Sequence, residues 1–149
     1  MLTIALFTRT NTKGINNSLP PELEPNFNRI KEWLDKLFAA FPSALLNSGY
    51  RSDALNRRIG GSATSYHKLA LAADVDSAKD NRLIFQWIID NVPFDLVIWE
   101  KGNDTNPDWV HFQLAKDGQA PRRIIHRFHL RNGKWIYRPC DRNGKLTTI

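Results

Sequence analysis

The chain contains little cysteine and no long apolar run. Its only cysteine, Cys140, excludes an internal disulfide and a cysteine-rich zinc site. No stretch reaches the roughly 18 consecutive apolar residues that a membrane span needs, so we expect no transmembrane segment. Residues 1–9 are too short, and too poor in basic residues, for a secretory signal peptide. We therefore expect a protein that is made in the cytoplasm without a signal peptide.

The 149 residues are enough for one domain and leave little room for two. Hydrophobic residues make up 42% of the chain and aromatic residues 11%, which allows a real core and argues against wholesale disorder. We predict a single domain over residues 1–149 and expect a monomer. Within it, residues 6–115 carry the polar motifs described below, and residues 118–149 form a basic tail that is rich in predicted strands.

Hydrophobic periodicity predicts helices early in the chain and strands mainly later. Apolar residues at helical spacing predict helices over 23–41 and 83–92, and Ser52 offers an N-cap for a short helix over 53–59. Strands are predicted over 44–48, 71–75, 94–99, 109–114, 123–130 and 135–137, the last two joined by a hairpin turn at Asn132-Gly133. This order favours an α+β fold, a small single domain with a mainly antiparallel sheet packed by helices.

Three residues that a hydrophobic core does not need are His67, Asp74 and His111. Two imidazoles and one carboxylate are a common catalytic zinc set, because the fourth coordination position stays open for water or substrate. Their spacing is not a local motif, so the three can meet only if their strands pair. Hydrogen-bonded, partly buried imidazoles and a turn carboxylate explain the same residues without a metal.

The polar segments also contain four motifs in a fixed order. They read S-G-Y-R-S-x-x-L-N from Ser48 to Asn56, I-G-G-S-x-x-S-x-H from Ile59 to His67, A-A-D at residues 72–74 and W-V-H at residues 109–111. In this order they resemble the zinc D-Ala-D-Ala peptidase family, in particular its small phage and bacterial members. The resemblance runs from about residue 6 to residue 114. It implies the small α+β fold that this family shares with the hedgehog signalling domain.

The resemblance implies that His67, Asp74 and His111 hold a zinc ion. It also implies a zinc-dependent hydrolase of peptide bonds in the peptidoglycan stem peptide, which acts on the cell wall as a carboxypeptidase or an endopeptidase. A phage lysin or a virion-borne enzyme would fit the lack of a signal peptide. Two alternatives stay open: a zinc-binding, catalytically inactive wall-binding module, and a basic nucleic-acid-binding protein. The sequence contains acids at both candidate base positions and no named nucleic-acid-binding motif, which disfavours both alternatives.

Two carboxylates are candidates for the general base that takes a proton from the attacking water. Some members of the family place an acid three residues before the last histidine ligand, and that position here is Asp108. The small phage-type branch instead places Glu at the end of the preceding strand, which here is Glu100. Strand alternation puts Asp108 and His111 on opposite faces, whereas Glu100 ends an apolar run where a charge has no packing role. We therefore favour Glu100 as the base, with Asp108 as the alternative.

The resemblance assigns substrate binding to Arg51 and Ser65. The planar guanidinium of Arg51 can hold a carboxylate or carbonyl of the peptide and help to stabilise the oxyanion; a surface salt bridge with Asp53 is the alternative. The hydroxyl of Ser65 can hydrogen-bond the substrate or orient His67. One position departs from the family pattern, since Ala70 stands where the family usually has Gly, which tolerates a positive φ.

The tail carries most of the net charge of +6. From residue 118 to residue 149 there are eight Lys or Arg residues and one acid, Asp141, so the tail sums to +7 and the rest of the chain to −1. Such a patch attracts polyanions, and we expect anionic wall polymers as its partner rather than nucleic acid. We predict that the tail raises the enzyme concentration on the wall and takes no part in the chemical step.

Overall fold

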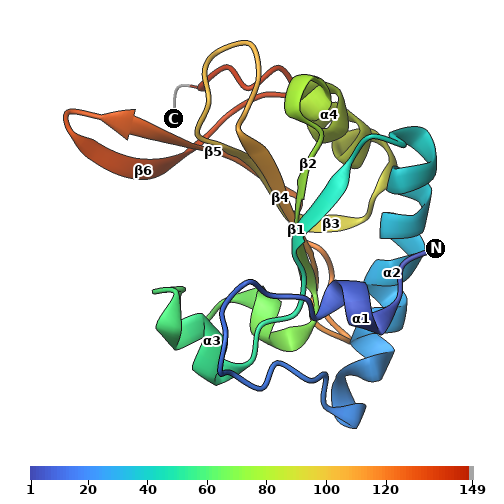
Figure 1. The fold of residues 1–149 in the computed structure, drawn as a ribbon. Coiled ribbons are helices and arrows are strands. Elements are labelled where there is room, and N and C mark those ends of the chain that lie inside the picture. Colours follow the sequence, from blue (N-terminus) through green and yellow to red (C-terminus); the bar gives the residue numbers. More distant parts are fainter. Residues whose placement is uncertain (148–149) are drawn as a thin grey trace.

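The computed structural model describes residues 1–147, and the last two residues of the predicted tail lie outside this range. One six-stranded sheet has the strand order β1-β2-β4-β3-β5-β6, and α2 and α4 cover one of its faces (Figure 1). The strands are β1 (Leu45–Ser48), β2 (Ala72–Asp76), β3 (Phe94–Glu100), β4 (Trp109–Leu114), β5 (Ile124–Arg131) and β6 (Lys134–Pro139). The helices are α1 (Ile4–Phe7), α2 (Glu24–Ala40), α3 (Asp53–Arg58) and α4 (Asn81–Asn91), with short 3-10 turns η1 (Pro21–Leu23), η2 (Tyr66–Leu69) and η3 (Ala78–Asp80). None of the helices in the described range has both the length and the apolar composition for a membrane crossing.

The two long helices form because their apolar residues recur at helical spacing and bury one stripe against the sheet. Pro25 lies in the first turn of α2, where its missing N–H costs no helical hydrogen bond, and Pro42 follows the C-cap residue Phe41. Fully buried side chains fill the space between helices and sheet, among them Ile30, Leu34, Ile84, Phe85, Trp99 and Phe112. The helices thus close one face of the sheet and leave the other face free for a site.

The sheet is antiparallel except where β3 pairs with β5 in parallel, so the predicted α+β fold is confirmed. The predicted helices and strands lie within about two residues of those observed. Ser52 caps α3 as predicted, because its hydroxyl accepts a hydrogen bond from the backbone N–H of Leu55 at 3.2 Å. The single turn α1 was not predicted, since four residues are too few to show a helical period.

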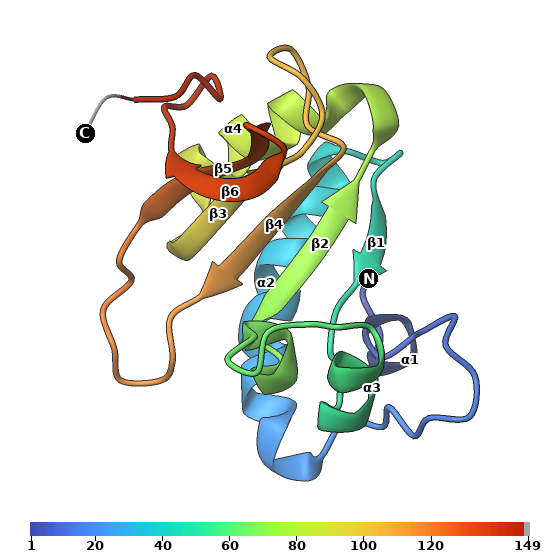
Figure 2. The same ribbon diagram turned by 90° about the vertical axis from the view of Figure 1, so that its left-hand side faces the viewer.

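The face of the sheet opposite the two long helices is open (Figure 2). In that view the β5–β6 hairpin lies at one end of this face, and α3 with the loop that follows it lies at the other end. β2 and β4 cross the middle between them. The open face is therefore bordered by two elements that are distant in sequence: two of the polar motifs lie at the α3 border, and the other two, residues 72–74 and 109–111, lie on the strands in the middle.

Candidate metal centre and catalytic cleft

Strand pairing brings the candidate metal ligands together. Asp74 in β2 lies directly opposite His111 in β4, and in an antiparallel pair such residues project from the same face. His67 comes from η2, which Ser65 caps by accepting a hydrogen bond from the backbone N–H of His67. One potential ligand atom from each of His67, Asp74 and His111 lies within 4.8 Å of the other two. Among the described residues this is the group of histidine and acidic side chains that could hold a metal ion.

The hydrogen bonds of both imidazoles leave one ring nitrogen of each directed at Asp74. His67 Nδ1 lies 2.7 Å from the Gly49 carbonyl oxygen, which can only accept, so Nδ1 carries the proton. His111 Nε2 donates to Gln113 Oε1 at 3.0 Å, because the amide nitrogen of Gln113 is directed at the carboxylate of Asp95. His67 Nε2 and His111 Nδ1 then face the Asp74 carboxylate at 3.3 and 2.9 Å.

This arrangement fits a divalent metal. In the neutral imidazoles the two nitrogens that face Asp74 are lone-pair donors, and a carboxylate is also a donor, so a cation or a proton must lie between them. Burial opposes the charged form of Asp74, but the neighbouring imidazoles outweigh it and hold the pKa of that carboxyl well below its usual range. Burial lowers the pKa of His67, which keeps its imidazole in the neutral, ligating form. Burial opposes the charged form of His111, but its hydrogen bond with Asp74 outweighs burial and raises the pKa of that imidazole, so a proton lies between the two groups when no metal is bound. A divalent cation would displace this proton, and two imidazoles and one carboxylate, with the second ring nitrogens anchored, are then the donor set of an open zinc site.

Glu100 lies beside this group and lines the same cleft. The cleft has a volume of about 940 Å³ and includes Arg51, His67, Asp74, Glu100 and His111 among its lining residues. Glu100 pairs with Trp109 across the β3–β4 ladder and is therefore the diagonal neighbour of His111 on one face. Its side chain is buried, and burial raises the pKa of the Glu100 carboxyl to about 7.

Asp108 lies elsewhere. It is exposed, it precedes β4, and it is not among the residues that line the cleft. Its backbone is used structurally, since the Asp108 N–H donates to the Glu100 carbonyl and its own carbonyl accepts from Asn81. Of the two candidate bases, the geometry therefore favours Glu100.

The raised pKa of Glu100 predicts a pH-dependent stability of the metal-free protein. Below about pH 4.5 the Glu100 carboxyl is protonated in both the folded and the unfolded state. Between pH 4.5 and 7 the unfolded state has already released this proton, whereas the folded state still holds it. Glu100 therefore lowers the free energy of unfolding as the pH rises through this range. We expect metal-free Glu100→Gln to match the wild type at pH 4 and to exceed it by about 3 kcal/mol at pH 8. Denaturant unfolding at several pH values measures this difference. It should shrink in zinc-loaded protein, because a dication stabilises the carboxylate; a difference that does not depend on pH would contradict the assignment.

Arg51 is held at the edge of the metal group by three side chains. Its guanidinium donates to Ser48 Oγ at 3.1 Å, to Asp74 Oδ2 at 3.3 Å and to Asn56 Oδ1 at 3.5 Å. Asp53, the alternative partner considered from the sequence, instead pairs with Lys68 at 2.8 Å. Arg51 therefore lies within the cleft rather than in a surface salt bridge.

Gly61 leaves the space in which Asn56 holds Arg51. A Cβ atom at Gly61 would overlap the side-chain oxygen of Asn56 and would lie 3.3 Å from the Arg51 guanidinium. We expect Gly61→Ala to displace Arg51 and to reduce kcat/KM by about a hundredfold, as a shift near 1 Å can do. Zinc content, measured on the same preparation, should stay near that of the wild type, whereas the melting temperature should fall because the buried Asn56 side chain has to move. Unchanged kcat/KM would show that the position of Arg51 does not matter.

The departure at Ala70 has a structural consequence. Ala70 ends η2 in the left-handed region at φ 58° and is fully buried. A left-handed Ala costs about 1 kcal/mol, which Gly would avoid. The position thus requires the backbone conformation that the family's usual Gly supplies, and this chain adopts it with Ala.

The basic tail packs against the rest of the domain through ion pairs, hydrogen bonds and strand pairing. Arg122 forms a bidentate pair with Asp95, with contacts of 3.0 and 2.7 Å. Arg123 donates to two carbonyls at the end of α4, and Arg127 pairs with Asp104 at 2.8 Å. β5 continues the sheet beside β3 and contributes to the lining of the cleft. The first strand of the tail thus forms part of the cleft wall, whereas the role of the tail in wall binding stays a prediction.

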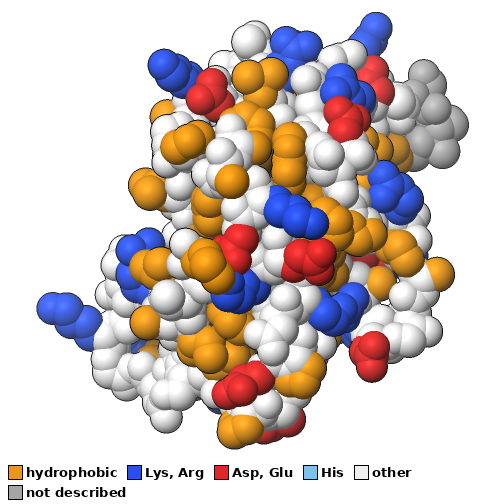
Figure 3. Space-filling model, turned by 90° about the vertical axis from the view of Figure 1, so that its right-hand side faces the viewer, with side chains coloured by type: hydrophobic (Ala, Val, Ile, Leu, Met, Phe, Trp, Pro, Cys, Tyr) orange, Lys and Arg blue, Asp and Glu red, His pale blue; other side chains and the backbone are white. Residues whose placement is uncertain are grey.

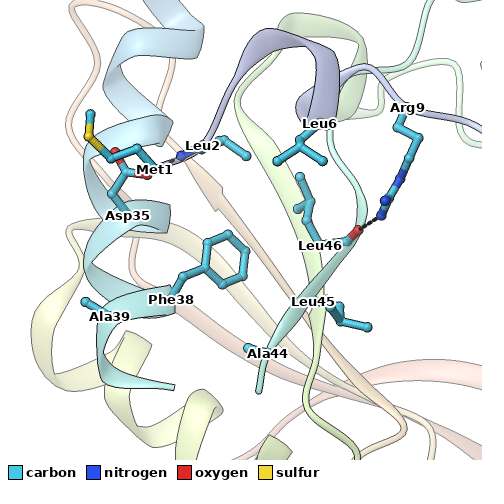
Figure 4. Close-up of a pocket in the computed structure, with 10 residues that line it drawn as sticks. All are labelled: Met1, Leu2, Leu6, Arg9, Asp35, Phe38, Ala39, Ala44, Leu45 and Leu46. Carbon is cyan, nitrogen blue, oxygen red and sulfur yellow. Dashed lines mark hydrogen bonds between the residues drawn. The ribbon is translucent and has the colours of Figure 1, made fainter. Parts of the chain in front are cut away.

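A second, apolar pocket of about 510 Å³ lies away from these groups, where α2 meets β1 and the N-terminal segment. Figure 3 shows this helical side of the molecule, on which hydrophobic and charged side chains are interspersed. In Figure 4, Phe38 of α2 faces Leu46 of β1 across the pocket. Its two charged residues are already bonded, Arg9 to the Leu46 carbonyl and Asp35 to the Leu2 N–H. The pocket thus offers apolar surface but no catalytic group.

Sequence reasoning missed two groups that orient the ligands, Gly49 and Gln113. The Gly49 carbonyl fixes His67, and nothing in the sequence distinguishes one carbonyl from another. Gln113 fixes His111, and its signal was available, because residues two apart in a strand share a face. Three cleft residues of the tail, His126, Phe128 and Tyr137, were also missed, since the parallel pairing of β5 with β3 is not encoded locally.

On the open face of the sheet, the buried carboxylate of Glu100 lies beside a candidate ligand set of two anchored imidazoles and the Asp74 carboxylate. This arrangement is typical of a metallopeptidase. Comparison with protein families agrees, since the model described as Peptidase M15 matches residues 2–113. The chain belongs to the peptidase M15 family, whose members are metallopeptidases and typically depend on zinc. A search of the curated proteins finds no match. The matched range ends within β4, so the β5–β6 hairpin lies outside it.

Proposed function

We propose that this protein is a zinc peptidase that cleaves an amide bond in the stem peptide of peptidoglycan. The observation that supports it best is the cleft in which the open donor set of His67, Asp74 and His111 faces Glu100 and Arg51. Family membership supports the class of reaction, and the motifs resemble those of wall peptidases. The specific bond, whether at the free end of the stem peptide or in a cross-link, is left to experiment.

In this proposal His67, Asp74 and His111 hold the zinc ion, which would lower the pKa of water and polarise the scissile carbonyl. Glu100 accepts the proton of the attacking water and later returns it to the leaving amine. A carboxyl with a pKa of about 7 suits both steps, because it can take and give a proton near neutral pH. Its burial in the cleft wall fixes its position relative to the peptide.

Arg51 has the role of an anion-stabilising group. Its contacts with Ser48, Asn56 and Asp74 hold the guanidinium in place before the substrate binds. A donor that is positioned in advance stabilises the developing negative charge on the peptide oxygen without a reorganisation cost. Ser65 lies in the same cleft, and its hydroxyl caps η2, so we assign it to ligand orientation together with substrate contact.

Purified peptidoglycan, incubated with the zinc-loaded enzyme and analysed by mass spectrometry, tests this function. We expect new amino and carboxyl termini within the stem peptide and intact glycan strands, and the fragments identify the bond. A chelator should stop the release of fragments. Retention of the protein on the wall without any cleaved peptide would favour the inactive binding module instead.

The outer face of the β5–β6 hairpin is where we place contact with anionic wall polymers. Arg131 lies opposite Lys134 across the hairpin, and Arg138 lies opposite Arg127, whose own charge is paired with Asp104, so like charges face each other at both positions. Such pairs are unfavourable unless an anion lies between them. Neutralising Arg131, Lys134 and Arg138 together should weaken wall binding severalfold at low salt and little above physiological salt, where screening acts over about 8 Å. Co-sedimentation with walls at two salt concentrations checks this, and turnover of a small soluble peptide should not change.

A further inference from the structure

The β5–β6 hairpin has two chemically different faces. Its register places Phe128 opposite Tyr137 and Leu130 opposite Trp135 on one face. The alternate positions carry the basic pairs described above, which therefore project from the other face. The hairpin separates its aromatic side chains from its positive charges.

The aromatic face forms a continuous row of rings. Phe128 stacks on Tyr137 with ring centroids 4.3 Å apart, and Trp135 lies 5.5 Å from Phe128 on the other side. His126 extends the row at its inner end, 6.4 Å from Tyr137. Cross-strand aromatic pairs stabilise a hairpin, which explains why the rings share one face. It does not explain why they lie on the face that is turned to the cleft.

This row continues the wall of the catalytic cleft. His126, Phe128 and Tyr137 line the cleft, and Phe128 pairs with Glu100 across the β3–β5 ladder. From there the row runs outward by about 7 Å, two residues along the strand, to Trp135. Trp135 and Tyr137 remain 46% and 54% exposed, whereas the other aromatic residues of the described range are buried or half-buried. Exposed apolar surface that adjoins an active site marks a binding surface.

The chemistry of the row matches a ligand with apolar and polar parts. Tyr and Trp present an apolar ring and a polar tip, and the charges of the hairpin lie on its other face. Lys101 contributes one ammonium group, 4.8 Å from the centre of the Trp135 ring. A pyranose ring matches this surface, because its C–H bonds form an apolar patch and its hydroxyls accept and donate hydrogen bonds at the edge.

We infer that the row of His126, Phe128, Trp135 and Tyr137 is a saccharide subsite, which binds an N-acetylhexosamine ring of the glycan strand while the attached stem peptide enters the cleft. The inference rests on the proposed function, since it is in peptidoglycan that such a sugar and such a peptide are joined. It makes the hairpin a selector for stem peptides that are still attached to glycan. The family match ends before the hairpin, so this subsite lies in the part of the chain that the family model does not match.

Titration of the metal-free and the zinc-loaded enzyme with the tetramer of N-acetylglucosamine, followed by NMR, tests the subsite without any hydrolysis. We expect the largest shifts at the Trp135 indole N–H and at the Tyr137 ring in both forms. Trp135→Ala, which leaves the Phe128–Tyr137 stack in place, should weaken binding about fivefold, and Trp135→Ala with Tyr137→Leu about tenfold or more. Ile136→Ala, on the other face of β6, is the matched control and should bind as the wild type does.

The kinetic counterpart compares a stem peptide attached to its disaccharide with the free peptide. The wild type should prefer the attached form by about tenfold in kcat/KM, and Trp135→Ala should lose most of that preference while it keeps kcat/KM for the free peptide. Shifts confined to other surfaces, or an equal preference in Trp135→Ala, would overturn the subsite. A preference for an anionic polymer over the tetramer at these rings would assign the row to a different ligand. If the protein bound the saccharide but cleaved no peptidoglycan, the proposed function would be refuted and the subsite would stand.

Discussion

His67→Ala is expected to lose both its zinc and its activity. The substitution removes one of the three proposed protein ligands, and because His67 is 3% exposed, a side chain at the protein surface cannot take its place. We expect zinc in the purified variant to fall from about one ion per chain to less than about a tenth, and turnover of peptidoglycan to fall at least a thousandfold. Elemental analysis and release of wall fragments measure the two effects on one preparation.

His129→Ala provides the matched control for this experiment. His129 lies in β5 opposite Ile136, on the face of the hairpin that is turned away from the cleft. The variant should keep its zinc and most of its activity. Full zinc occupancy in His67→Ala would refute the ligand assignment, whereas zinc loss in both variants would indicate a general loss of structure, which melting temperatures would reveal.

Glu100→Gln should keep its zinc and lose two to four orders of magnitude in turnover. Gln has nearly the shape of Glu and retains a hydrogen-bonding group, but it cannot accept the proton of the attacking water. The same variant should gain stability in the metal-free protein at pH 8, as described above. Loss of activity combined with gain of stability distinguishes a catalytic carboxylate from one that holds the fold.

Asp108→Asn is the control for the base, since the sequence offered Asp108 as the alternative. Asp108 is exposed and lies outside the cleft lining, so its side chain should contribute little to turnover. We expect a reduction of less than about fivefold. If Asp108→Asn lost more activity than Glu100→Gln, the role of base would pass to Asp108.

Much of the fold was predictable because its determinants are local. The stripe of apolar residues predicted α2, Ser52 predicted the start of α3, and Asn132-Gly133 predicted the hairpin turn between β5 and β6. These signals act over a few residues, so the unfolded chain already contains them. The parallel pairing of β3 with β5 was not predictable in this way, because it joins strands separated by β4 and depends on the whole sheet.

In the candidate site, too, some features follow from the sequence and others only from the tertiary structure. The sequence by itself determined which residue types are present: the motifs around Arg51, His67 and His111, the two rival acids, and the basic character of the tail. Strand alternation in the sequence already favoured Glu100 over Asp108, and tertiary structure adds the burial of Glu100 and its place in the cleft, which are properties of packed strands. The anchoring of His67 by a backbone carbonyl, and the division of the hairpin into an aromatic and a basic face, were decided there too. Distances and exposure arise only when remote segments meet, and for that reason the sequence could supply the candidate groups but not their arrangement.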